Sequence, residues 1–123
     1  MKRPFLLYHW SPSRKRQKIA KQGLRVGCRS RGNDGSAWYP KHVCFCRTPS
    51  AAWALSAMHD GRKIAWDLWC CWSADIAPYT TRFAGQDPNT GWTMTEYRST
   101  RSIAKSRLWY VGMRMYRGRK ACR

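Results

Sequence analysis

Acidic residues are scarce in this sequence. Six Asp and Glu residues stand against 24 Lys and Arg residues in 123 positions, which gives a net charge of +18. Glutamate occurs once, as Glu96. A field of this sign attracts polyanions and speeds their encounter, so nucleic acid or an acidic protein is an expected partner. The alternative is a solvated basic surface with no dedicated partner.

Long apolar runs are also missing. No stretch approaches the ~18 apolar residues of a membrane span. Lys2 and Arg3 resemble a charged leader, but only Phe5, Leu6 and Leu7 follow them. An export signal has an apolar core of roughly seven to fifteen residues. We therefore expect no membrane partner and a place of action in the cytosol of the cell that makes the protein.

The six cysteines lack the paired Cys-x-x-Cys spacing of structural zinc sites. Disulfides are rare in a reducing compartment. Cys44, Cys46 and Cys70 lie in apolar runs, where cysteine behaves as a small core residue. We expect no metal; a small zinc-dependent nucleic-acid-binding protein is a third interpretation. The remaining cysteines are Cys28, Cys71 and Cys122.

The apolar fraction is 43%, with eight Trp, six Tyr and three Phe, and it fills the core of one domain in a chain of this length. Basic residues are concentrated at the two ends: 12 lie in residues 1–49, three in 50–97 and nine in 98–123. We expect one domain over residues 1–116 and a basic, mobile tail over 117–123.

Alternating and helical patterns divide the chain into short elements. Segments rich in Gly, Pro, Asn and Asp predict loops over residues 28–40 and 73–91. The strongest strand is IAWDLWCCW, where a period of two places Ile64, Trp66, Leu68, Cys70 and Trp72 on one face. The predicted strands cover residues 5–10, 42–46, 64–72, 92–98 and 107–115, and the predicted helices cover 12–22 and 50–58.

Both predicted helices begin with an N-cap residue followed by Pro at the first helical position, as Ser11-Pro12 and Thr48-Pro49. Gly23 predicts a left-handed end to the first helix, and Asp60-Gly61 closes the second.

The first helix has a small apolar side and a large basic one. Ile19 and Ala20 are its expected core contacts. Arg14, Lys18 and Lys21 fall on one side at helical spacing. With their neighbours they form the expected surface for nucleic acid or another acceptor, made of Arg14, Lys15, Arg16, Lys18 and Lys21.

Three separated segments resemble the diphtheria-toxin-like ADP-ribosyltransferases, the superfamily that includes the poly(ADP-ribose) polymerases. In LLYHWS (6–11) and IAKQGLRVG (19–27), a His on a strand is followed two residues later by Ser, and a helix then ends in Gly-Leu. HVCFCRTPSAAWA (42–54) is similar to the second strand and the helix after it. TEYRSTRSIAKSRLWYV (95–111) is similar to the segment that carries the catalytic Glu. The segments occur in the family's order.

The resemblance implies an α+β fold with mostly antiparallel strands, arranged as two packed small sheets with two short helices. It implies NAD as the co-substrate and transfer of ADP-ribose with release of nicotinamide. Glu96 and His9 would be the catalytic pair. Glu96 would act on the nicotinamide ribose, and His9, supported by Ser11, would bind the adenosine-side ribose.

The resemblance also implies a place for the nicotinamide. The backbone of Trp10 and the side chain of Ser50 would bond the amide group, and Trp53 would stack on the ring. Taken alone, Ser50 could equally belong to a helix cap, and a Trp at helical spacing is more often a core residue.

A carboxylate suits this chemistry because cleavage between nicotinamide and ribose builds positive charge on the sugar, as in glycoside cleavage. The same group can take a proton from the acceptor. Without the resemblance, a Glu flanked by Tyr97 and Arg98 is usually a solvent-facing strand residue paired with Arg. A lone histidine such as His9 is usually a core or edge residue.

The chain departs from the family at three places. Trp10 replaces a usual Gly, and Cys44 or Phe45 occupies the place of a common Tyr. Met94 stands two residues before the Glu, where Gln or Glu marks the arginine-modifying branch, so arginine is disfavoured as the acceptor. We expect DNA, RNA or a protein bound to them as the acceptor. The alternative is a non-catalytic nucleic-acid-binding protein on the same scaffold.

Overall fold

Antiparallel ladders organise the chain in the computed structural model, which describes residues 3–26, 30–31, 38–39, 43–55, 63–76, 80–86 and 93–115. One sheet has the order β1-β5-β8, a second has the order β4-β7-β6, and β2 pairs with β3. The strands are β1 (Leu6–Pro12), β2 (Ser30–Arg31), β3 (Trp38–Tyr39), β4 (Val43–Phe45), β5 (Ala65–Trp72), β6 (Thr80–Gln86), β7 (Thr93–Ser99) and β8 (Trp109–Met115).

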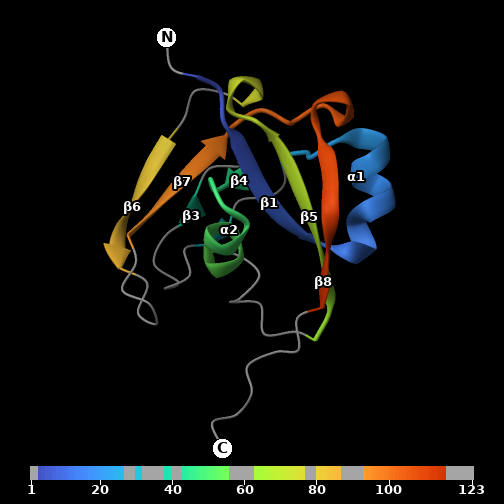
Figure 1. The fold of residues 1–123 in the computed structure, drawn as a ribbon, viewed down its shortest axis with the longest axis horizontal. Helices are drawn as coiled ribbons and strands as arrows, with labels where there is room; N and C mark the ends of the chain where they lie inside the picture. Colours follow the sequence, from blue (N-terminus) through green and yellow to red (C-terminus); the bar gives the residue numbers. More distant parts are fainter. Residues whose placement is uncertain are drawn as a thin grey trace, which may run out of the picture.

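Within the described residues, two short α-helices accompany the sheets, α1 (Arg16–Gln22) and α2 (Pro49–Leu55). Three short 3-10 turns are described: η1 (Ser13–Lys15) lies between β1 and α1, η3 (Ser73–Asp75) follows β5, and η4 (Lys105–Arg107) precedes β8. In Figure 1, β6 and β7 lie on the left, and β8 and α1 lie on the right. The predicted class, a small α+β fold of mostly antiparallel strands with two short helices, is confirmed at this level.

Two segments predicted as loops contain strands. The segment 73–91 contains β6, and the segment 28–40 contains β2 and β3. Most of the Pro and Asp residues that suggested a loop flank β6, whereas TTRFAGQ itself contains Thr and Phe, which favour strands. The loop prediction was therefore wrong for these residues. The predicted tail, 117–123, lies outside the described residues.

The first helix begins later than predicted. Ser11 and Pro12 are the last residues of β1, where they pair with Asp67 and Trp66. Ser11 is therefore not an N-cap, and no side-chain hydrogen bond caps the start of η1. Proline is tolerated at a strand end because it needs to donate no ladder hydrogen bond there. The chain turns through η1 before α1 begins.

The end of α1 is confirmed at Gly23, which has a φ of 77°. Its backbone N–H donates to the carbonyl oxygen of Ile19 at 2.7 Å. The next residue, Leu24, forms an isolated antiparallel bridge with Ile103. A Cβ atom at Gly23 would overlap the carbonyl oxygen of Ile103, so both the positive φ and the close backbone approach require glycine.

Gly23→Ala is expected to lower the free energy of unfolding by about 2–4 kcal/mol, because the new methyl group is strained by φ and collides with backbone. Gly112→Ala is the matched control, since a Cβ there meets nothing within 4 Å. Urea unfolding followed by circular dichroism measures both. Equal stabilities of the two variants would contradict this reading of Gly23.

Strand β5 is buried on both faces, which the predicted single apolar face did not anticipate. Trp69 and Cys71 lie in a cluster with Leu7, Phe45 and Ile19. Trp66 and Leu68 lie in a second cluster with Trp10, Ala52 and Trp53 of α2. Because successive residues of a strand point to opposite faces, one strand supplies both cores. Ile19 is the predicted core contact of α1, whereas Ala20 is exposed and that prediction was wrong.

The start of α2 follows the sequence pattern. Thr48 Oγ1 accepts a hydrogen bond from the backbone N–H of Ala51 at 3.1 Å, and Pro49 is the first helical residue. Thr48 is therefore the N-cap, as predicted. The expected end of this helix, Asp60-Gly61, lies outside the described residues.

A buried carboxylate ties α1 to the first sheet. Asp67 is fully buried and accepts two hydrogen bonds from Arg16, at 2.8 and 2.7 Å. Ser13 donates to Asp67 at 2.6 Å, and Tyr110 of β8 contributes a longer contact of 3.5 Å. Burial by itself raises the pKa of Asp67, but hydrogen bonds from Arg16 and Ser13 and the charge of Arg16 bring that pKa below its ordinary value.

Each α-helix has seven residues. Within the part of the chain that the structure describes, no helix is long and apolar enough to cross a membrane.

Candidate functional site

His9 lies at the junction between the sheet β1-β5-β8 and the sheet β4-β7-β6. Tyr8 of β1 and Cys46 exchange two backbone hydrogen bonds, of 2.8 and 3.0 Å. One residue further along β1, the His9 ring occupies the junction instead, and Nδ1 lies 2.7 Å from the carbonyl oxygen of Cys44. A carbonyl oxygen only accepts, so the proton is on Nδ1 and Nε2 is left as an acceptor.

The His9 ring is half-buried and tilted against Phe45, with centroids 5.6 Å apart. Burial lowers its pKa, the Cys44 carbonyl opposes this shift, and the charge of Lys15 adds to it. The imidazole is therefore neutral at neutral pH, and it is suited to hydrogen bonding with a hydroxyl group.

The main chain of Trp10 faces the same junction. Along an antiparallel strand, backbone groups two residues apart point to the same edge. The backbone N–H and C=O groups of Tyr8 point to Cys46. The backbone groups of Trp10 therefore point to the same edge of β1, beyond the Tyr8–Cys46 pair. The Trp10 ring turns away: its indole N–H donates to the carbonyl oxygen of Pro49 at 2.9 Å, and it packs edge-to-face on Trp53 at 4.8 Å.

Glu96 is buried rather than solvent-facing, with 7% of its surface exposed. It lies on β7, and Arg98 donates from Nη2 to Oε2 at 3.1 Å. The thiol of Cys44 hydrogen-bonds Glu96 from the neighbouring strand β4. The ion pair with Arg98 agrees with the interpretation of Glu96 as an ordinary strand residue paired with Arg. Its burial disagrees with the solvent-facing position that this interpretation implies.

Cys44 lies between the two predicted catalytic residues. His9 contacts its carbonyl oxygen at the edge of β4, whereas Glu96 contacts its thiol on one face of β4. The structure therefore brings His9 and Glu96 to one residue, but to different parts of it. No hydrogen bond or ion pair between His9 and Glu96 is seen among the described residues.

The thiols beside Glu96 are held in the neutral form. Burial raises the pKa of Cys46 to about 12, and the charge of Glu96 adds to this effect. The pKa of Cys44 is raised for the same two reasons, in the same order. A thiol of this kind is a poor nucleophile at neutral pH.

Of the other two residues predicted to contact nicotinamide, Ser50 is exposed and Trp53 is buried. Ser50 is exposed near the start of α2, with Oγ 3.3 Å from Oγ1 of Thr48. Trp53 is 4% exposed, and the Arg114 guanidinium lies over its ring, 4.1 Å from the centroid. Stacking of nicotinamide on Trp53 therefore requires Arg114 to move.

Ser11 is buried on the same face of β1 as His9, opposite Asp67. No described hydrogen bond links Ser11 to the imidazole. Its predicted role as support for His9 therefore rests on their shared face alone.

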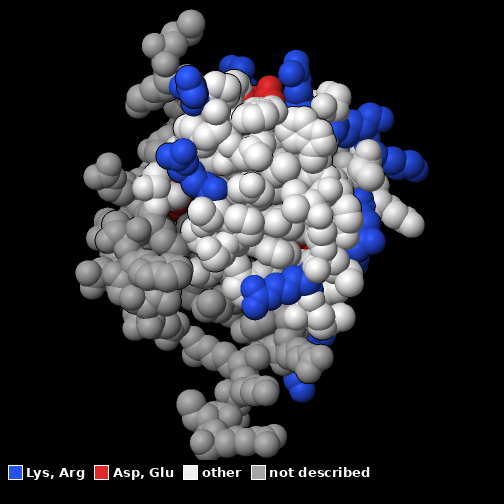
Figure 2. All heavy atoms as spheres, viewed as in Figure 1, with Lys and Arg blue, Asp and Glu red and all other residues white. Residues whose placement is uncertain are grey.

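Four of the five predicted acceptor-binding cations are exposed without a described partner, namely Arg14, Lys15, Lys18 and Lys21. The fifth is committed to the fold, because Arg16 is ion-paired with Asp67 and lies over the Tyr110 ring, 4.9 Å from its centroid. Figure 2 shows Lys and Arg gathered along the right edge, where α1 lies in Figure 1, and a largely uncharged centre.

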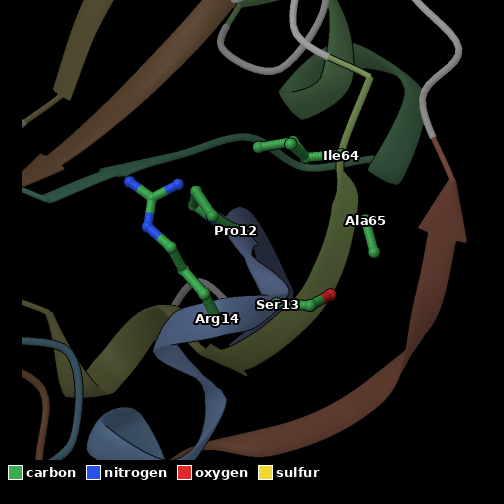
Figure 3. A pocket seen from close by; sticks show the side chains of 5 residues that line it. All are labelled: Pro12, Ser13, Arg14, Ile64 and Ala65. Carbon is green, nitrogen blue, oxygen red and sulfur yellow. The ribbon is translucent and has the colours of Figure 1, made fainter.

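A separate hollow of about 220 Å³ lies at the end of β1 and the start of β5. Figure 3 shows Arg14, Pro12 and Ile64 turned toward the same space, with Ser13 and Ala65 completing the lining. The lining is mostly apolar with one cation at its rim. None of the residues predicted to bind NAD lines it.

Sequence reasoning missed the buried carboxylate network. Asp67 is the one charged residue in IAWDLWCCW, and a lone Asp in an apolar strand signals a buried, paired carboxylate. Its partner Arg16 was assigned to the acceptor surface instead. Among the residues that the structure describes, no three His, Cys, Asp or Glu side chains are close enough to share a metal ion. Cys28 and Cys122 lie outside them.

The chain was compared with models of known protein families, with curated proteins and with solved structures, and none of the three comparisons finds a match.

Proposed function

We propose that the chain is an ADP-ribosyltransferase that uses NAD as its donor. The observation that carries the proposal is the junction between the two sheets. There, a neutral His9 with an accepting Nε2 contacts the carbonyl oxygen of Cys44, and the only glutamate of the chain contacts the Cys44 thiol. The backbone of Trp10 lies two residues beyond Tyr8, which pairs with Cys46. His9, Trp10 and the glutamate are the residues that the three-segment resemblance assigns to the two riboses and the nicotinamide amide.

The proposed reaction breaks the bond between nicotinamide and C1 of its ribose. Nicotinamide leaves with the bonding electron pair as a neutral molecule, and an acceptor oxygen or nitrogen forms the new bond to C1. Glu96 stabilises the positive charge on the sugar and receives the acceptor proton, directly or through water. His9 Nε2 accepts a hydrogen bond from the adenosine-side ribose and holds the donor in place.

The proposed acceptor is DNA, RNA or a protein bound to them. The exposed cations of α1 and η1 would hold phosphate groups, since Arg14, Lys15, Lys18 and Lys21 have no described acidic partner. Phosphate contacts release counterions, so binding through them falls steeply as salt rises.

Labelled NAD tests the proposal directly. The protein is incubated with NAD labelled on the adenosine side, with DNA, RNA or cell protein, across a salt series. We expect release of nicotinamide and transfer of label to a nucleic acid or a bound protein, with transfer falling steeply with salt. NAD that stays intact with every acceptor would overturn the transferase proposal, and salt-independent transfer would overturn the polyanionic acceptor.

A second candidate is a non-catalytic nucleic-acid-binding protein on the same scaffold. Two observations favour it: Glu96 is engaged by Arg98, and Trp53 is buried beneath Arg114. The two candidates differ in NAD binding. Isothermal titration with NAD separates them, because binding that His9→Ala weakens supports the transferase, whereas no NAD binding alongside tight nucleic-acid binding supports the second candidate.

A further inference from the structure

The exposed aromatic surface of the first sheet is not used by the proposed reaction. Strand β8 is the last strand in the order β1-β5-β8, and its residues are about half exposed although most of them are apolar. Trp109 is 47% exposed, and Trp72, at the end of β5, is 40% exposed. Exposed Trp residues in contact with each other are uncommon on a free surface and suggest a binding role.

The two tryptophans form one unit, called here the tryptophan platform. Their rings meet edge-to-face at 90°, with centroids 6.4 Å apart. Trp109 pairs in register with Cys70, which lies two residues from Trp72 on the same face of β5. The strands therefore hold both rings in place, and a large part of each Trp residue remains exposed.

Cations flank the platform. Lys105 and Arg107 lie in η4, immediately before β8, and both are exposed. Arg107 keeps 66% of its side-chain surface exposed, even though it lies 3.6 Å from Asp75. An exposed ion pair at this distance is weak. Arg107 can therefore exchange this carboxylate for a phosphate with little loss.

We infer that the tryptophan platform binds single-stranded nucleic acid, with unpaired bases stacked on Trp72 and Trp109 and phosphates bound by Lys105 and Arg107. Aromatic side chains beside cations recognise single strands because every base has a flat face to stack and every nucleotide carries a negative charge. Duplex bases are already stacked on one another, so a duplex offers the platform only its backbone. The inference rests on the nucleic-acid part of the proposed function and not on the transferase chemistry.

Charge favours this partner over a second copy of the chain. The net charge of +18 opposes close approach of two copies, and the cations beside the platform would face each other in a symmetric contact. The same charges attract a polyanion.

The test compares a fluorescent single strand of about 12 nucleotides with an abasic strand of equal length, using the full chain and fluorescence anisotropy. Trp109→Leu and Trp72→Leu keep an apolar side chain but remove the ring. We expect each to weaken binding of the normal strand by about 10-fold and to leave binding of the abasic strand nearly unchanged. Met115→Leu, at a site that is 55% exposed on the same strand, is the control and should bind like the parent.

Three results would overturn the inference. These are unchanged binding of the normal strand by both Trp variants, equal losses on the two strands, or sedimentation that shows a dimer dissociated by Trp109→Leu. Arg107→Gln is measured alongside and should lower the salt dependence by about one phosphate contact. Nicotinamide release is a separate readout: its absence, with platform binding intact, would remove the transferase proposal and leave this one standing.

Discussion

Glu96→Gln is expected to slow nicotinamide release from NAD by about 100- to 1000-fold, with NAD affinity changed only a few-fold. The glutamine keeps the size and hydrogen-bonding shape of the side chain. It removes the negative charge that the proposed mechanism uses against the developing positive charge of the ribose. The loss therefore belongs in kcat and not in KM. Stopped assays of nicotinamide at saturating and low NAD measure both.

The ion pair with Arg98 calls for a control. Arg98 is 12% exposed at its side chain and donates to Glu96, so either partner could affect folding when the other is removed. Arg98→Gln breaks the same pair and retains the carboxylate. If Glu96 only stabilises β7, the two variants will lose stability alike and keep the same rate per folded molecule. A rate loss confined to Glu96→Gln supports the catalytic role.

Arg16→Gln is expected to lower the free energy of unfolding at neutral pH by clearly more than an exposed-site control, because it leaves the buried Asp67 charge without its main partner. Lys18→Gln removes the same charge from an exposed position of the same helix and should change stability by less than about 0.5 kcal/mol. Denaturant unfolding of the three proteins gives the comparison. A small effect of Arg16→Gln would mean that Ser13 and solvent are enough to stabilise the buried charge of Asp67.

The difference between the Arg16 variant and the parent should depend on pH. In the parent, the pKa of Asp67 is below its ordinary value, so its stabilising effect is present above about pH 4 and is lost as pH falls through the folded-state pKa. In Arg16→Gln, burial is opposed only by the hydrogen bonds from Ser13 and Tyr110, so we expect the pKa of Asp67 to rise. The variant then gains stability as pH falls from this raised pKa toward about pH 4, and the parent loses stability below about pH 4, so the gap narrows as pH falls through both ranges.

The local patterns predicted much of the fold. The positive φ at Gly23 and the Thr48 cap of α2 depend on backbone chemistry within a few residues. The strand over 64–72 depends on a long apolar run. The errors in the predicted elements occurred where pairing with a distant strand determines the local structure. Ser11 and Pro12 extend β1 because β5 pairs with them, which no local cap signal reveals.

The site was less predictable than the fold. No sequence pattern indicated that Cys44 would contact both His9 and Glu96, because these contacts depend on how β1, β4 and β7 assemble. Arg16 shows the same limit. Its spacing on a basic helix indicated a free surface cation, and only the position of Asp67 on β5 makes it an anchor.

The strand order has a kinetic consequence. β1 pairs with β5, bringing Leu6 to Trp72, and β4 pairs with β7, bringing Val43 to Ser99. β5 in turn pairs with β8, which follows it along the chain. A chain emerging from the ribosome therefore holds unpaired apolar strands until β7 and β8 have been made. Long loops must close before these contacts form, which places folding on the scale of milliseconds to seconds and makes early synthesis the period of greatest exposure to aggregation.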